Sequence, residues 1–153
     1  MHLKKARIRE YKSVWDSGEF ELGNITCLVG KNEAGKTALL EALNRLNPLN
    51  EEDTDLDVTT DYPRSEVEDY RAAVEDGERD EAEVVTAVYE VEDSDLAHAI
   101  EAFGEAAFPS RELTLSKGYD NTRRFSFRVD EAAALRHLLN GAELPGSVLS
   151  TLE

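Results

Sequence analysis

Eight consecutive residues of this sequence have the types and the spacing of a phosphate-binding loop. They are Gly30, Lys31, Asn32, Glu33, Ala34, Gly35, Lys36 and Thr37, which fit the pattern G-x-x-x-x-G-K-[ST]. The two glycines allow close approaches that a Cβ would obstruct, so the amides of the loop can converge on an anion. We expect Lys36 to reach the β- and γ-phosphates of a nucleotide, the Thr37 hydroxyl to hold Mg²⁺, and Ala38 to complete the contact set.

The flanking residues predict the elements that would position this loop. Residues 25–29 form a short apolar run, which is typical of a buried strand. After the loop, Leu39, Leu43 and Leu46 follow the spacing of one helix face, and the helix is expected to begin near Gly35. A helix starting there would add its positive dipole end and its unpaired N–H groups to the site. An ordinary glycine-rich turn before a helix is the alternative, which this strand–loop–helix order disfavours.

The composition is that of a globular and strongly acidic chain. Its 153 residues are 41% hydrophobic and carry 33 acidic against 17 basic side chains, a net charge of −16. Such a charge repels nucleic acid, so we do not expect this chain alone to bind DNA strongly. The acidity suits either a high-salt cytoplasm or a basic partner. The one cysteine, Cys27, is expected inside the core strand, and its isolation indicates a reducing, cytoplasmic setting without disulfides.

Hydrophobic periodicity predicts an α/β fold, with a mixed sheet that contains antiparallel strands and with peripheral helices. In the first strand, Ala6 and Ile8 are expected on one face and the basic side chains Lys5, Arg7 and Arg9 on the other. This basic side could approach a nucleotide, but such a stripe is more often a solvated sheet face. In the predicted hairpin, Phe125, Phe127 and Val129 are expected to point inward. No apolar run is long enough for a membrane span. The expected strands are 3–11, 19–22, 25–29, 82–91, 111–117 and 123–129, and the expected helices are 35–46, 65–74, 94–103 and 130–139.

The N-terminal residues resemble those of a known family. Arg-Ile-Arg-Glu-Tyr-Lys-Ser at 7–13 and the run from Leu28 to Leu43 are similar to the N-terminus of ABC-type ATPases of the SMC/RecF/OLD group. The Asn-Glu-Ala-Gly-Lys-Thr version of the loop looks closest to OLD-family proteins and their AAA-like relatives. This resemblance implies a P-loop NTPase lobe that binds ATP and Mg²⁺, and it places Lys12 and Ser13 near the nucleotide.

Several parts of a working ATPase are not found in this sequence. We find no apolar strand ending in Asp-Glu, which would hold Mg²⁺ and polarise the attacking water. The family resemblance also implies a glutamine after the N-terminal lobe, and this sequence contains no glutamine. We therefore expect a single domain over 1–153 that forms the first lobe of a longer ATPase head. Its expected parts are strands, P-loop and helix over 1–48, a helix and antiparallel-strand subdomain over 49–141, and an ill-defined tail over 142–153.

The resemblance also predicts the partners and leaves two other functions open. It implies a C-terminal ATPase lobe of the same protein, ATP-driven homodimers of heads, and DNA contact through the full-length protein in repair, maintenance or defence. One alternative is a nucleotide-sensing or interaction module without turnover. The other is a small-molecule kinase, for which Arg123 and Arg124 are the only candidate lid arginines.

Overall fold

A computed structural model describes residues 1–31, 35–48 and 55–141 of the chain. The chain divides into two compact units, and each is described by itself. Across the described residues, no helix has the length and hydrophobicity required to cross a bilayer. The sheet unit comprises residues 2–89 and 113–126, and the helical unit comprises Met1, 90–112 and the chain from Phe127 onward.

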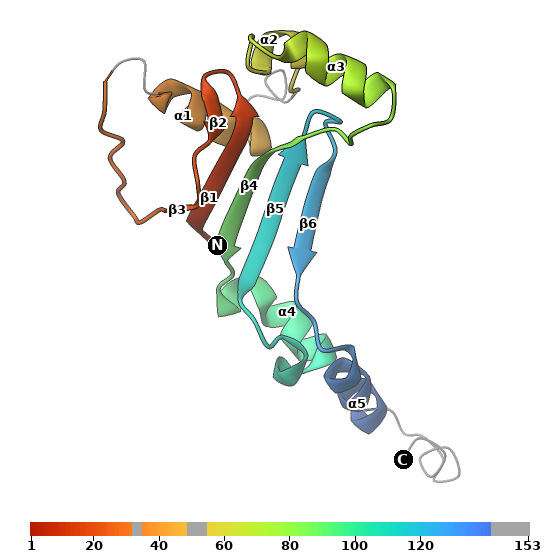
Figure 1. The fold of residues 1–153 in the computed structure, drawn as a ribbon. Helices are drawn as coiled ribbons and strands as arrows, with labels where there is room; N and C mark the ends of the chain where they lie inside the picture. Colours follow the sequence, from red (N-terminus) through yellow and green to blue (C-terminus); the bar gives the residue numbers. More distant parts are fainter. Residues whose placement is uncertain (32–34, 49–54, 142–153) are drawn as a thin grey trace. The chain divides into compact units, whose positions relative to one another are not determined.

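An antiparallel sheet is the centre of the sheet unit. Its strand order is β2-β1-β4-β5-β6, with β3 paired to β1, and neighbouring long strands point in opposite directions in Figure 1. In the register of the first hairpin, Tyr11 pairs with Val14, so Lys12 and Ser13 form its two-residue turn. The strands are β1 (His2–Tyr11), β2 (Val14–Asp16), β3 (Phe20–Glu21), β4 (Glu83–Glu90), β5 (Glu112–Gly118) and β6 (Arg123–Phe127).

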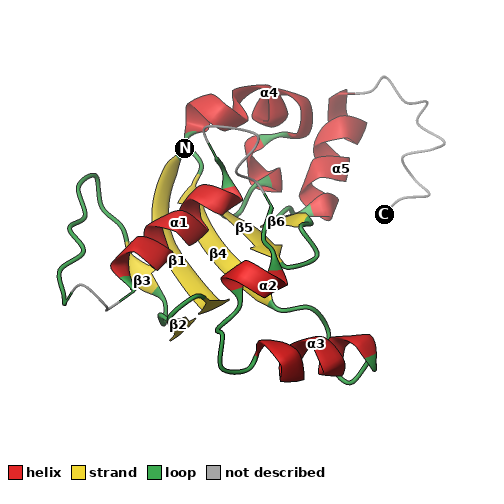
Figure 2. Cartoon of the chain, turned by 90° about the horizontal axis from the view of Figure 1, so that it is seen from above, coloured by secondary structure: helices red, strands yellow, loops and turns green. Residues whose placement is uncertain are grey.

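Helices flank the strands in the sequence. In the sheet unit, α1 lies across one face of the sheet (Figure 2), and its buried residues Ala38, Ala42 and Leu46 belong to the same core as Ile8 of β1. This unit holds α1 (Lys36–Leu46), α2 (Val58–Asp61) and α3 (Val67–Glu75), whereas the helical unit holds α4 (Asp93–Phe103), the 3₁₀-helix η2 (Glu105–Ala107) and α5 (Glu131–Gly141).

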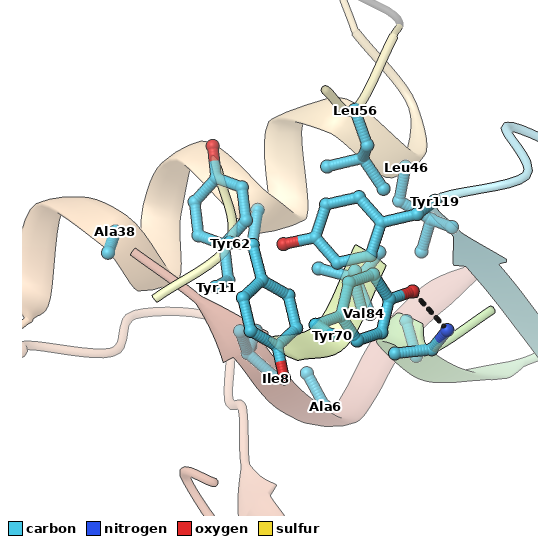
Figure 3. Close-up of a cluster of buried hydrophobic side chains, with 14 residues drawn as sticks. Ala6, Ile8, Tyr11, Ala38, Leu46, Leu56, Tyr62, Tyr70, Val84 and Tyr119 are labelled. Carbon is cyan, nitrogen blue, oxygen red and sulfur yellow. Dashed lines mark hydrogen bonds between the residues drawn. The ribbon is translucent and has the colours of Figure 1, made fainter. Parts of the chain in front are cut away.

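The core of the sheet unit is rich in tyrosine. Tyr62 stacks on Tyr70 with 4.1 Å between ring centroids, and Tyr119 lies 5.9 Å from each of them (Figure 3). The Tyr70 hydroxyl accepts a hydrogen bond from the Ala82 amide at 2.9 Å. Burial raises the pKa of Tyr119 well above its ordinary value, so its hydroxyl remains a hydrogen-bond donor at any physiological pH.

The basic stripe of β1 faces away from this core and is paired with carboxylates. Lys5 Nζ lies 3.0 Å from Glu19, and the Arg7 guanidinium binds Asp16 through both carboxylate oxygens. The latter contact lowers the pKa of Asp16 to about 2. These pairs are those of a solvated sheet face.

Most of the predicted elements are confirmed, including the mixed α/β class and the antiparallel strands. The alternation in the first strand is also confirmed, because Ala6 and Ile8 are buried on the face opposite Lys5 and Arg7. The helix expected over 130–139 is also present, and Asp130 caps its start by accepting a hydrogen bond from the Ala133 amide at 2.9 Å. The short elements α2 and β2 were not predicted, because a single turn or three residues leave little periodicity in the sequence.

The prediction of a buried strand over residues 25–29 is wrong. This segment has no strand assignment, Ile25 and Val29 are 94% and 91% exposed, and Cys27 is exposed rather than buried. An apolar run becomes a buried strand only when a neighbour supplies hydrogen bonds along its edge. Among the described strands, none pairs with this segment.

Two predictions about side-chain direction also need correction. Phe125 is 78% exposed and Val129 45% exposed, although both were expected to point inward. β6 is the last strand in the sheet order, so it has a neighbouring strand on one side only, and alternation along such an edge strand does not by itself bury one of its faces. Val129 lies beyond the end of β6 at Phe127. In α1 the most buried line runs through Ala38, Ala42 and Leu46, while the predicted Leu39 and Leu43 pack at its margin.

Candidate functional site

Gly35 places the start of α1 at the end of the glycine motif. The helix begins at Lys36, and its N-cap residue Gly35 has a φ of 77°, in the left-handed region. Among the residues that the structure describes, no side chain caps this end of the helix. The first-turn N–H groups and the positive dipole end are therefore available to an anion instead of a capping oxygen.

The Lys36 ammonium is folded back over the beginning of the loop. Its Nζ donates to the carbonyl oxygen of Gly30 at 2.7 Å and to that of Lys31. Both acceptors are neutral main-chain groups. A phosphate oxygen would be a stronger acceptor for the same ammonium, because hydrogen bonds between two charged groups exceed those to neutral ones.

The β1–β2 turn lies directly against the glycine that starts α1. A Cβ added at Gly35 would be 2.8 Å from Val14 Cγ2 and 3.3 Å from Ser13 Oγ. Only glycine permits both this approach and the positive φ at this position. The structure therefore brings Ser13, a residue implied by the family resemblance, beside the loop.

Hydrogen bonds from distant parts of the chain hold this turn and the strand end before it in an uncommon backbone conformation. Glu10 and Lys12 have φ values of 50° and 51°, a region that non-glycine residues seldom occupy. The Lys12 amide donates to the carbonyl oxygen of Asp61 at 2.6 Å, and the Tyr119 hydroxyl donates to that of Glu10 at 2.6 Å. Strained backbone is retained where surrounding contacts fix it, and such positions cluster at functional sites.

A polar pocket of about 400 Å³ connects this turn with α1. It is lined by Lys12, Thr37, Leu40, Glu41, Asn44 and Arg45. The Lys12 ammonium forms an ion pair with Glu41, which raises the pKa of Lys12. The sequence analysis did not single out Glu41, Asn44 or Arg45. Helical spacing was the available signal, because positions four and seven residues after Thr37 lie on its face of the helix.

The structure assembles most of the predicted site from separate segments. Of the predicted residues, Asn32, Glu33 and Ala34 lie outside the described part of the chain. In residues 1–31, 35–48 and 55–141, no cluster of three or more acidic, histidine or cysteine side chains could hold a metal ion. The described residues of the predicted site are Lys12, Ser13, Gly30, Lys31, Gly35, Lys36, Thr37 and Ala38.

Comparison with known proteins identifies the family. The model of the AAA ATPase domain matches residues 1–106, more than half of the chain. This chain belongs to the AAA ATPase domain family. The match confirms the resemblance of the N-terminal part of the chain to AAA-like ATPases, and the matched range includes all residues of the candidate site. Residues 107–141, which include β6 and α5, lie beyond the matched part of the AAA ATPase domain.

Other comparisons add little to this assignment. No curated protein matches this AAA ATPase domain. A solved structure from work on ATP-driven dimerization and DNA-stimulated activation of SMC ATPases is 14% identical to it. That alignment covers 100% of this chain and 92% of the other, with a TM-score of 0.42. The family assignment therefore rests on the match over residues 1–106.

Proposed function

We propose that this AAA ATPase domain binds ATP with Mg²⁺ through residues 30–38. The observation that carries the proposal is the uncapped start of α1 at Gly35, with the Lys36 ammonium beside it and Ser13 against it. N–H groups, a helix dipole and a cation then meet at one place, which is the chemistry that a polyphosphate requires. Lys12 and Ser13, which form the β1–β2 turn beside Gly35, would add further contacts to the nucleotide.

Mg²⁺ fits this site as a companion of the phosphates rather than as an ion held by the protein alone. Mg²⁺ keeps several waters and commonly takes only one or two protein ligands together with phosphate oxygens. The Thr37 hydroxyl, in the first turn of α1, is the protein ligand expected from the motif. When bound, the ion would neutralise developing charge on the phosphates.

Turnover would require a second lobe, and residues 25–29 are where we expect that lobe to dock. Ile25 and Val29 expose almost all of their apolar surface next to the phosphate loop. A strand of the C-terminal ATPase lobe would pair with residues 25–29 and cover their apolar side chains. The same lobe would bring the acidic residues that hydrolysis needs. The full-length protein would then act as an SMC/RecF/OLD-like ATPase in DNA repair, maintenance or defence, with two heads dimerising on ATP.

A module that binds nucleotide without turnover is the second candidate. It is favoured by the lack of an apolar strand ending in Asp-Glu in this sequence. DNA-stimulated ATP hydrolysis by the full-length protein would support the ATPase, whereas binding without hydrolysis in that protein would support the module. The kinase alternative is the weakest of the three, because the guanidinium of Arg124, one of its two candidate lid arginines, is paired with Asp120.

A nucleotide series tests the proposal on the 153-residue chain. Because the loop amides and Lys36 address the β- and γ-phosphates, we expect affinity to fall from ATP to ADP, and at least tenfold from ATP to AMP. Calorimetric titration with Mg²⁺, and again with a chelator, measures this order. Equal affinity for ATP and AMP would mean that the site does not read the polyphosphate, and would contradict the proposal.

Replacing Gly35 by alanine tests the contact between the loop and the β1–β2 turn. The new Cβ would clash with Val14 and Ser13 and would sit at a positive φ. We expect the turn to move away from α1 and ATP affinity to fall about tenfold, with strain of roughly 1–3 kcal/mol. Gly77→Ala, at a φ of 73° with open space around it, is the matched control for backbone strain alone. An equal loss of affinity in both variants would remove the turn from the site.

A further inference from the structure

The helical unit leaves much of its apolar surface uncovered. α4 contains no buried residue, and Ala133 is the only buried residue of α5. Phe103 and Leu135 are 43% and 52% exposed, in contrast to Ile8 of the sheet unit, which is fully buried. Large exposed apolar side chains that gather in one place mark an interaction surface more often than scattered ones do.

These side chains line one groove, which we call the α4–α5 groove. Its volume is about 520 Å³, and Glu131 is the only charged side chain among its lining residues. The volume lies in the range of pre-formed binding pockets, and a lining this apolar offers few hydrogen-bond partners to a polar ligand. The apolar lining includes Ala99, Phe103, Phe108, Val129, Leu135 and Leu138.

Two close contacts fix the walls of the groove. Gly104 ends α4 with a φ of 81°, and a Cβ there would lie 2.7 Å from Nδ1 of His137 on α5. The Asp130 amide, just before α5, donates to the carbonyl oxygen of Ala107 in η2 at 2.8 Å. Gly104 therefore lets the end of α4 approach α5 closely, and the hydrogen bond between Asp130 and Ala107 joins η2 to the start of α5. These contacts pre-organise the groove. Pre-organisation lowers the ordering cost of binding.

Charge selects among the possible occupants of the groove. Two copies of so acidic a unit would repel one another, as would this unit and an anionic membrane. A cationic partner is attracted instead, and an apolar groove between two helices can accept the apolar face of a third helix. The described helical unit carries nine acidic side chains, Glu90, Glu92, Asp93, Asp95, Glu101, Glu105, Glu112, Asp130 and Glu131, against three arginines, Arg111, Arg128 and Arg136.

We propose that the α4–α5 groove binds a basic amphipathic helix of a partner protein. Apolar side chains of the partner at helical spacing would enter between Phe103 and Leu135, and its lysines or arginines would be attracted by the net negative charge of the helical unit. This surface belongs to the helical unit, and α5, which forms one of its walls, lies beyond residue 106, where the family match ends. The proposal is therefore independent of nucleotide binding at the phosphate loop.

Designed peptides test this proposal directly. The probe is a helical peptide with leucines along one face and lysines on the other. A scrambled peptide keeps its composition but breaks the leucine stripe, and a third peptide has glutamate in place of lysine. We expect the probe to bind at least tenfold more tightly than either, by fluorescence anisotropy, and to bind less tightly as salt increases. Equal binding of the scrambled peptide would reduce the effect to charge alone and would overturn the proposal.

Matched variants locate the binding. Phe103→Ser and Leu135→Ser should each weaken the probe at least tenfold, while circular dichroism stays unchanged. Phe125→Ser removes an exposed phenylalanine from β6, outside the groove, and should leave affinity unchanged. Equal losses of affinity in all three variants would contradict binding of the probe in the α4–α5 groove. A dimer that Phe103→Ser dissolves would make the occupant a second copy, and stronger probe binding after removal of residues 142–153 would make it that segment. Either result would overturn the proposal.

Discussion

Lys36→Ala is expected to lower the affinity for ATP with Mg²⁺ at least 100-fold, which corresponds to about 2.7 kcal/mol. The variant removes the ammonium group of the first residue of α1, whose present partners are two neutral carbonyls. The variant would lose the charge-assisted contact that Lys36 is expected to make with the phosphates, whereas the backbone amides of the motif would remain. Calorimetric titration of both proteins measures the change.

Lys4→Ala is the matched control for this prediction. It removes the same charge from an exposed position of β1, so any effect of the chain's net charge on an anionic ligand is equal in the two variants. We expect its affinity to equal that of the unaltered chain. If Lys36→Ala retained full affinity, or if Lys4→Ala lost as much, the phosphate loop would not be the binding site.

The local parts of the site could be predicted from sequence because their signals lie within a few residues. The glycines, the lysine and the proline after the helix specify where α1 begins and ends, and the structure places it at Lys36–Leu46. The periodicity of β1 likewise predicted which side of the strand holds Ile8. Such predictions depend on spacing along one element and need no knowledge of its neighbours.

The parts that were not predicted depend on contacts between distant segments. Asp61 accepts the hydrogen bond of the Lys12 amide, and Tyr119 donates to the carbonyl of Glu10 just before the turn, although both partners are far away in the sequence. Nothing in the local pattern around Lys12 indicates a positive φ or these two partners. Only the fold reveals that the turn, the helix and the tyrosine core form one scaffold around the candidate site.

Residues 25–29 show the limit of an apolar pattern most clearly. The run has the composition of a strand buried on both faces, yet a strand also needs a neighbour to pair with its N–H and C=O groups. The described strands leave it unpaired. The sequence thus records what the segment is suited to bury, whereas the structure shows what this chain itself buries.

The same substitution at two isoleucines distinguishes a segment that this chain buries from one that it leaves exposed. Ile8→Ala removes a fully buried side chain from the centre of the sheet unit and should lower the free energy of unfolding by about 2–5 kcal/mol. Ile25→Ala makes the same chemical change at a side chain that is 94% exposed, so we expect a change within about 0.5 kcal/mol. Urea unfolding of the 153-residue chain, followed by circular dichroism, measures both. A comparable loss in Ile25→Ala would show that residues 25–29 pack within this chain and need no second lobe to cover them. That outcome would remove the structural reason for docking a strand there, whereas an unchanged stability would leave residues 25–29 available for the docking proposed above.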